Sequence, residues 1–287
     1  MAMRSAIFLM AAATVGLAAC GDRAGDPAPR DQGPAAASTA SGDDAPAADS
    51  GAAGATDGGT GGEKTEIANE LFEFSFEIPA EAAAIPALAA ALRAERGKAR
   101  AELETQAREA RRDAAASDFP YHAYAYDKSW ERVADLPDWL SLSATIYTFS
   151  GGAHGMTVFD SLVWDKRADA PLDPIAMFVD KAALNAAIKQ PFCAELDRQR
   201  AEKRGEPIAS GVGEFNKCLD PADSTIILGS SNGRKFDRIG VLITPYDAGP
   251  YAEGAYEVTL PVTDAVIAAI KPRFRPAFSS ARRPRAS

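Results

Sequence analysis

The chain of 287 residues is poor in the side chains that build metal sites: it has two histidines, His122 and His154, and three cysteines. Two imidazoles without a group of cysteines cannot supply a usual zinc ligand set, so we expect neither a metal nor a cofactor. Basic runs are scarce as well. The one example is Arg282-Arg283-Pro284-Arg285, within a terminal segment, 278–287, that we interpret as a solvated tail. Acidic and basic residues are close to balance after residue 65, so nothing indicates nucleic-acid binding.

Long apolar runs are missing except at the N-terminus. Ala6 to Ala19 is almost uninterruptedly apolar, but it is shorter than the about 20 residues that a membrane span needs. With Arg4 in front of it, the run has the composition of a secretory signal peptide covering residues 1–19.

The signal ends in Leu17-Ala18-Ala19-Cys20, which resembles a bacterial lipobox. We therefore expect cleavage before Cys20 and attachment of lipid to its thiol, which would anchor the chain to a membrane. Gly21, in place of an aspartate, favours the outer membrane over the inner one on the periplasmic side. An ordinary secretory signal with an incidental cysteine is the alternative.

Aromatic and large aliphatic residues are absent from Gly21 to Gly62. Such a segment cannot bury enough surface to offset its ordering entropy, so we predict a disordered linker over residues 20–64. Seven aspartates against two arginines give residues 21–62 a net charge of −5, out of −9 for the chain. The acidic balance is therefore mostly a property of this tether, whose r.m.s. reach is about 35 Å.

The two remaining cysteines, Cys193 and Cys218, form an even pair in an oxidising compartment. We predict a disulfide between them, and a bridge closing a loop of this size contributes about 3 kcal/mol.

Alternating and helical periodicities predict the elements of the domain. In Leu71–Ile78 the phenylalanines share one face, which is typical of a half-buried strand in an antiparallel sheet. Residues 82–116 predict one long amphipathic helix packed against a sheet, with a coiled coil as the alternative. Further strands are predicted at 121–126, 139–149, 156–165, 224–229, 236–244 and 256–260, and helices at 174–178, 181–189, 191–204 and 264–270. Strands in runs with helices between them indicate an α+β class, with helices packed on an antiparallel sheet.

A glycine-rich loop, Ser150–Gly155, connects two of these strands, and we select Gly151, Gly152, His154 and Gly155 as candidate binding residues. The loop lacks the lysine and following helix of a phosphate cradle, and Ser150 does not fit a hydrolase elbow. His154 as a general base would need a carboxylate, and the nearby Asp160 and Asp165 are not shown to converge on it. A simple hairpin turn is the remaining interpretation.

A second loop, Thr244–Gly254, holds two tyrosines and two acids, so Tyr246, Asp247, Tyr251 and Glu253 are candidate binding residues. Tyrosines give a large contact area at low entropic cost, which suits a recognition surface. A rigid corner before the last strand explains the same residues. As a glycosidase pair, Asp247 and Glu253 give only a weak signal.

Together these motifs carry a resemblance. Tyr147–Gly155, Trp164-Asp165, Leu172-Asp173-Pro174 and Pro245–Gly254 are similar to the paired extracytoplasmic domains of unknown function in the anti-sigma factor RsiV. The first also resembles the N-terminal domain of the peptidoglycan deacetylase PdaC. The resemblance implies two closely associated α+β subdomains, 65–168 and 169–277, and a cell-wall setting, since RsiV binds lysozyme and PdaC acts on peptidoglycan.

The chain lacks the sigma-binding segment of RsiV and the metal-binding catalytic domain of PdaC. We therefore expect a lipid-anchored envelope module that recognises a lysozyme-like muramidase or peptidoglycan, more a binding protein than an enzyme. A wall-glycan hydrolase or deacetylase-related enzyme using His154 and nearby acids is the rival. A structural partner of an outer-membrane assembly is a third hypothesis.

Overall fold

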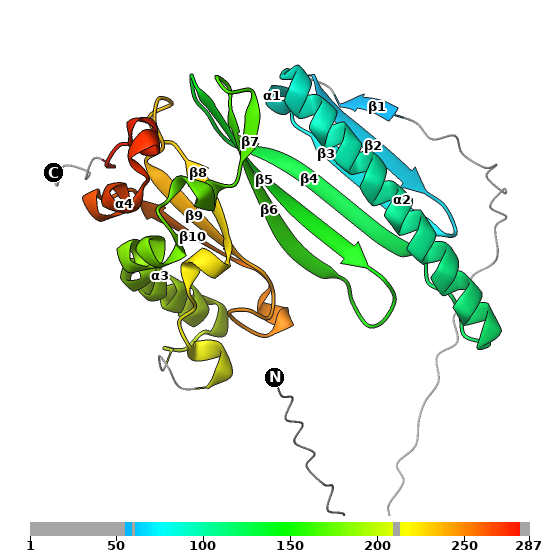
Figure 1. Ribbon diagram of the computed structural model, residues 1–287. Coiled ribbons are helices and arrows are strands. Elements are labelled where there is room, and N and C mark those ends of the chain that lie inside the picture. The colour runs from blue at the N-terminus through cyan, green and yellow to red at the C-terminus, as the bar shows by residue number, and fades with distance from the viewer. Residues whose placement is uncertain (1–54, 59–60, 209–212, 282–287) are drawn as a thin grey trace, which may run out of the picture. The chain divides into compact units, whose positions relative to one another are not determined.

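The computed structural model describes residues 55–58, 61–208 and 213–281. Cys20, the signal segment and most of the predicted linker lie outside these ranges. The described residues form one compact unit. Helices and antiparallel strand pairs make up most of it, so the predicted α+β class is confirmed (Figure 1).

The larger sheet has seven strands in sequence order. They are β1 (Ala55–Gly58), β2 (Gly62–Ala68), β3 (Phe72–Ile78), β4 (Tyr124–Asp135), β5 (Trp139–Phe149), β6 (Met156–Asp165) and β7 (Ala170–Leu172). Neighbours pair antiparallel except β3 and β4, which are parallel, so the prediction of a purely antiparallel sheet was wrong at this pair. The prediction of a disordered linker up to residue 64 was also wrong at its end, because β1 and the start of β2 pair within it.

The parallel pair needs a long crossover, and the helices α1 (Ala80–Ala83) and α2 (Pro86–Ala116) provide it. The single helix predicted from residue 82 is interrupted here. Ile85 is extended, with φ −102° and ψ 106°, and Pro86 opens α2. A residue before proline is disfavoured in the helical conformation, which accounts for the break.

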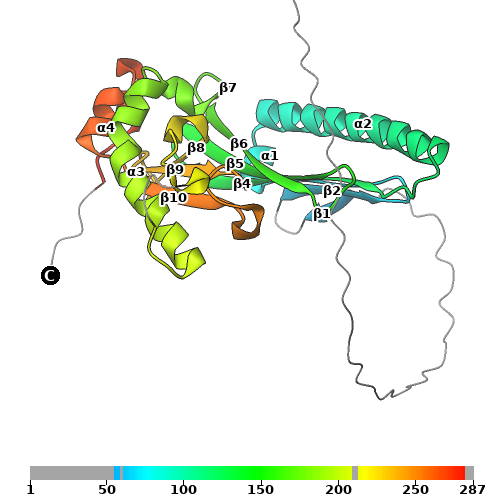
Figure 2. The same cartoon turned by 90° about the horizontal axis from the view of Figure 1, so that it is seen from below.

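One face of the sheet is covered by α2 (Figure 2). The alternate residues of β3 meet the apolar stripe of α2 there, as the sequence predicted. The buried residues of this first core are Phe72, Phe74, Phe76, Ile78, Ala82, Leu88, Leu92, Leu103, Ala107, Trp130, Leu140, Leu142, Ala144 and Trp164.

The second part begins with η1 (Pro174–Met177) and α3 (Lys181–Arg204). The Asp173 and Asp180 side chains cap these helices, and Gly205 ends α3 in the left-handed conformation, with φ 72°. The predicted restart at Pro191 was wrong, because α3 runs through it without interruption. The proline removes one helical hydrogen bond, but its buried helix neighbours Ile188 and Phe192 hold both sides in the second core.

A three-stranded antiparallel sheet follows, in the order β10–β9–β8. Its elements, with the short helices around it, are η2 (Glu214–Asn216), η3 (Pro221–Asp223), β8 (Thr225–Gly229), β9 (Arg238–Ile243), η4 (Tyr251–Glu253), β10 (Tyr256–Pro261), α4 (Asp264–Ala269) and η5 (Pro272–Ala277). The predicted strand from 236 begins two residues later. In the connection between β8 and β9, the Asn232 side chain accepts from the Arg234 and Lys235 amides.

The two parts share apolar packing. The second core is built on α3, β8, β9, β10 and α4, yet it also takes in Ala134 of β4, Leu136 directly after β4, and Val163 of β6. Strand β7 lies beyond the predicted boundary at residue 168 and still pairs with β6. The strands of the first part therefore contribute to both cores.

The solvated tail was predicted to start at residue 278, which is too early. Phe278 is only 3% exposed and forms a bridge with Phe236. The Ala281 amide donates to Val262 O. Residues 278–281 therefore belong to the folded unit, and the arginines of the tail lie outside the described residues.

The disulfide between Cys193 and Cys218 is confirmed, with Cα atoms 5.5 Å apart. It joins α3 to the segment that carries η2. Among the described residues, no helix is long and apolar enough to cross a membrane.

Candidate functional site

The β5–β6 hairpin presents the first predicted loop. Its last strand pair is Thr148 with Met156, so the glycine-rich segment is the tip. Gly151 and Gly152 have φ of 88° and 94°, a conformation that glycine adopts readily. Position 155 requires glycine for a different reason. Gly155 is buried, and a Cβ atom there would lie 2.4 Å from the Tyr147 ring.

The second predicted loop connects β9 to β10. It is held by the single turn η4 and by the Asp247 carboxylate, which accepts from the Thr244 hydroxyl at 2.8 Å. Tyr246 adopts a φ of 76° although it is not glycine. Such a conformation costs about 1–3 kcal/mol and persists only where the surroundings impose it, often at functional sites.

These two loops, far apart in the sequence, meet. The His154 ring stacks on the Tyr251 ring with centroids 3.8 Å apart and planes 18° apart. The Tyr246 hydroxyl lies 3.2 Å from His154 Nε2, and the Tyr251 hydroxyl donates to Gly155 O at 3.0 Å. We call His154, Tyr246 and Tyr251 the aromatic cluster.

His154 makes a hydrogen bond through each ring nitrogen. Nδ1 lies 2.9 Å from Gly155 O, a group that can only accept, so Nδ1 carries a proton. Nε2 lies 3.2 Å from the Tyr246 hydroxyl, which can donate or accept. His154 is exposed and Tyr246 is 44% exposed, so ring faces and a hydroxyl group are available to a ligand.

Glu253 lies beneath this surface instead of on it. Its carboxylate pairs with Arg204 of α3 at 2.7 Å and also accepts from the Tyr256 hydroxyl. Burial alone would raise the pKa of Glu253, but the hydrogen bonds from Arg204 and Tyr256 outweigh it and lower the pKa. Burial and the bond to Glu253 raise the pKa of Tyr256 to about 12. Glu253 thus remains ionised and supports the loop.

The acids that an enzyme would need are engaged elsewhere. Asp160 pairs with Lys128 at 2.9 Å, and Asp165 accepts from the backbone amides of Arg167 and Ala168. The structure brings neither acid to His154, and Asp247 and Glu253 are held by the contacts described above. The geometry therefore gives no support to the rival in which His154 and these acids act together.

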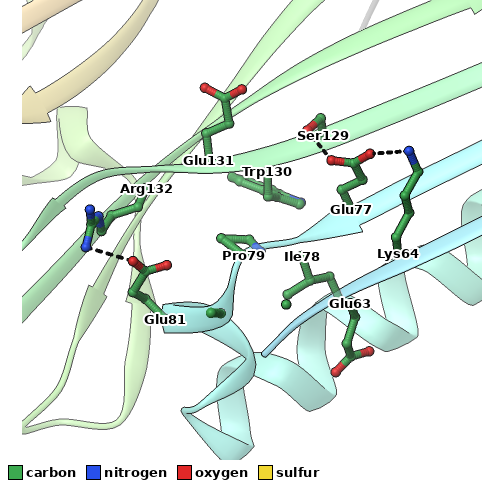
Figure 3. A pocket seen from close by; sticks show the side chains of 12 residues that line it. Glu63, Lys64, Glu77, Ile78, Pro79, Glu81, Ser129, Trp130, Glu131 and Arg132 are labelled. Atoms are coloured by element: carbon green, nitrogen blue, oxygen red, sulfur yellow. Dashed lines mark hydrogen bonds and ion pairs between the residues drawn. The ribbon is translucent and has the colours of Figure 1, made fainter. Parts of the chain in front are cut away.

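Sequence reasoning did not find a separate hollow of about 740 Å³ where β3 ends beside β4. Figure 3 shows two ion pairs within it: Lys64 with Glu77 at 2.8 Å and Arg132 with Glu81 at 2.7 Å. Both cationic side chains of its lining are therefore already engaged by carboxylates, and the hollow is a weaker candidate than the aromatic cluster.

Two supporting arginines were also missed. Arg200 and Arg204 lie one turn apart on α3, and in sequence they resemble the solvated face of a helix. Their spacing of four residues shows that they share a helix face, but nothing local identifies their partners in the β9–β10 loop.

The fold and its loops define an α+β domain in which one loop from each sheet contributes to an exposed aromatic cluster. Residues 65–157 match the family model described as Deacetylase PdaC. This segment, from β2 to the start of β6, is therefore a PdaC-type domain, as the resemblance implied. It contains His154 but not the β9–β10 loop.

The solved structures that are similar to the chain include two DUF3298 family proteins. One is a DUF3298 family protein from Pseudomonas aeruginosa PAO1, with 18% identity, 77% of this chain and 97% of that chain covered, and a TM-score of 0.44. The other is a member of the DUF3298 family from Bacteroides fragilis NCTC 9343, with 15% identity, 70% and 89% covered, and a TM-score of 0.42. No curated protein matches the chain.

Proposed function

We propose that this chain is a lipid-anchored binding module of the bacterial envelope, which recognises peptidoglycan or a lysozyme-like muramidase through its aromatic cluster. The observation that carries this proposal is the meeting of His154 with Tyr246 and Tyr251. Both candidate loops, chosen independently from the sequence, contribute to one exposed surface.

The chemistry of the cluster favours recognition. Tyrosine and histidine rings offer stacking faces, and the Tyr246 hydroxyl adds a polar group at a place that stays partly wet. The strained backbone of Tyr246 indicates that the loop is held in advance in one conformation, and preorganisation lowers the entropic cost of binding. The PdaC-type domain is consistent with a cell-wall ligand.

The anchor rests on the sequence. Cys20 follows an apolar run of signal-peptide length, and the tether after it is long enough to hold the domain away from a lipid surface. We place the protein in the periplasm on the outer membrane. Labelling cells with a palmitate analogue tests this: the natural chain should incorporate label, a Cys20→Ser chain should not, and label in both would refute the assignment.

Co-sedimentation of the full chain with purified sacculi, and its affinity for a lysozyme, test the proposed ligand. Binding to one of the two at micromolar concentration is expected, and Tyr246→Ala and Tyr251→Ala should each weaken it about tenfold or more. Phe119→Ala is the matched control, because Phe119 is 71% exposed just after α2 and outside the cluster. Binding of neither ligand, or equal loss with the control, would overturn the proposal.

A further inference from the structure

Two arginines of α3 connect the site to the disulfide. We call residues 244–254 the site loop and residues 213–218 the disulfide loop. Arg200 is fully buried. Its Nε donates to Ala248 O in the site loop at 2.9 Å, and its Nη2 donates to Lys217 O in the disulfide loop at 3.2 Å.

Arg204 repeats this bridge one turn further along. Its Nε and Nη2 donate to the Glu253 carboxylate of the site loop at 2.7 and 3.0 Å. Its Nη1 donates to Asn216 Oδ1 of the disulfide loop at 2.5 Å. Each guanidinium therefore holds the same two loops together.

The position of the disulfide loop depends on the covalent bond. Cys218 ends this loop and is bonded to Cys193, about two helical turns before Arg200 on α3. Lys217 O and Asn216 Oδ1 are within two residues of Cys218, so the bond fixes the two acceptors. The Arg200 charge itself is paired with Asp197, whose carboxylate accepts from Nη1 at 3.0 Å. Loss of Lys217 O would still leave the buried Nη2 group without an acceptor, which is energetically unfavourable.

The site loop has little room to rearrange when one of these bonds is lost. A Cβ atom on Gly249 would lie 2.0 Å from Glu253 Oε2. The Lys203 ammonium group also donates to Glu253 O and Ala255 O, at 2.6 and 2.8 Å. A change in the Arg204–Glu253 pair is thus transmitted to the short helix η4, which begins with Tyr251.

We propose that Arg200 and Arg204 are positioning residues for the aromatic cluster, and that the Cys193–Cys218 disulfide regulates ligand binding through them. A dithiol reductant donates two electrons, the S–S bond breaks, two thiols form, and the reductant becomes a disulfide. Release of the disulfide loop then loosens the site loop. The regulatory meaning rests on the proposed function, whereas the coupling between the loops does not.

The coupling is tested without any ligand. The full chain carrying Cys20→Ser has only the pair Cys193 and Cys218 as cysteines. Its amide hydrogen exchange is compared before and after reduction with dithiothreitol. Faster exchange is expected in the disulfide loop and at the Glu253 and Gly254 amides, which donate to Pro250 O and Tyr251 O, while the β5–β6 pair stays protected. Unchanged exchange at Glu253 and Gly254, or loss of protection throughout the chain, would overturn the proposal.

The regulation is tested with sacculi or lysozyme, whichever the oxidised chain binds. Reduction should weaken binding about tenfold. Arg204→Gln should weaken it similarly in the oxidised chain, and Arg204→Lys should retain part of the affinity. Arg198→Gln is the control, because Arg198 pairs with Glu195 and Glu202 on the exposed side of α3. Equal affinities of the oxidised and reduced chains would refute the regulation, whereas no binding by the oxidised chain would refute the proposed function alone.

Discussion

The imidazole ring of His154 lies flat against the phenol ring of Tyr251, with centroids 3.8 Å apart. One ring comes from the tip of the β5–β6 hairpin and the other from η4, so the contact exists only when both parts of the unit are folded. The surface that this contact creates therefore depends on the tertiary structure. The strained backbone of Tyr246 lies next to this surface.

Replacing Tyr246 by glycine should separate stability from recognition. Glycine accepts a φ of 76° without strain, so we expect the free energy of unfolding to stay the same or rise by up to about 1 kcal/mol. Binding to the ligand of the wild-type chain should fall about tenfold, because the hydroxyl group and ring are lost. Urea denaturation and a binding isotherm measure the two effects, and lower stability would contradict the assignment of strain.

Gly155→Ala should damage the hairpin tip. The new methyl group would lie 2.4 Å from the Tyr147 ring, which must move, and overpacking of this kind costs about 1–3 kcal/mol. Because Gly155 O also accepts from Tyr251, ligand binding should weaken as well. Thermal denaturation checks the first effect.

Gly97→Ala is the matched control for that substitution. Gly97 lies in the middle of α2, and a Cβ there meets nothing within 4 Å. Alanine should therefore stabilise the chain by about 0.5–1 kcal/mol through helix propensity. A loss of stability would show that α2 is packed differently around this residue.

Acid should weaken the Glu253 support. The pKa of Glu253 is lowered in the folded chain because the bonds from Arg204 and Tyr256 outweigh the effect of burial. The stabilisation is therefore complete above its ordinary pKa of 4.5 and is lost as the pH falls through the lowered value. The stability difference between the wild type and Glu253→Gln should shrink from about pH 6 to about pH 3. A difference that is independent of pH would exclude Glu253 as its source.

Lys128 offers a test of how a buried charge is tolerated. Its side chain is 2% exposed and pairs with Glu95 and Asp160, which are 36% and 47% exposed. Removing both acids with Glu95→Gln and Asp160→Asn should cost about 3 kcal/mol, because the ammonium group stays buried without a counter-charge. Lys128→Met should cost less than about 1.5 kcal/mol, because the exposed acids regain water. The reverse order in chemical denaturation would refute this account.

Local patterns predicted the elements whose determinants are local. The bounds of β5 and β6 agree with the prediction, because alternation and a glycine-rich turn are contained within the hairpin. The starts of η1, α3 and α4 agree for the same reason. The residue before each of them, Asp173, Asp180 or Thr263, accepts with its side chain from an amide two or three residues ahead.

Pairings across the sequence could not be predicted in the same way. The parallel register of β3 with β4 depends on a crossover of more than forty residues, and neither strand contains a signal for it. Both site loops were identified, because glycines and tyrosines gather in them. The bridges of Arg200 and Arg204 were not, because a guanidinium on an amphipathic helix looks the same whether its partner is water or a distant loop.

The burial of Phe278 makes the two cores unequal in what they need to close. This ring completes the second core against Phe236 and Phe178, and it follows β10, α4 and η5 in the sequence. The buried residues of the first core all lie between Phe72 and Trp164. The first core can therefore assemble without any residue of the β10–η5 segment, whereas the second stays open until residue 278 has docked.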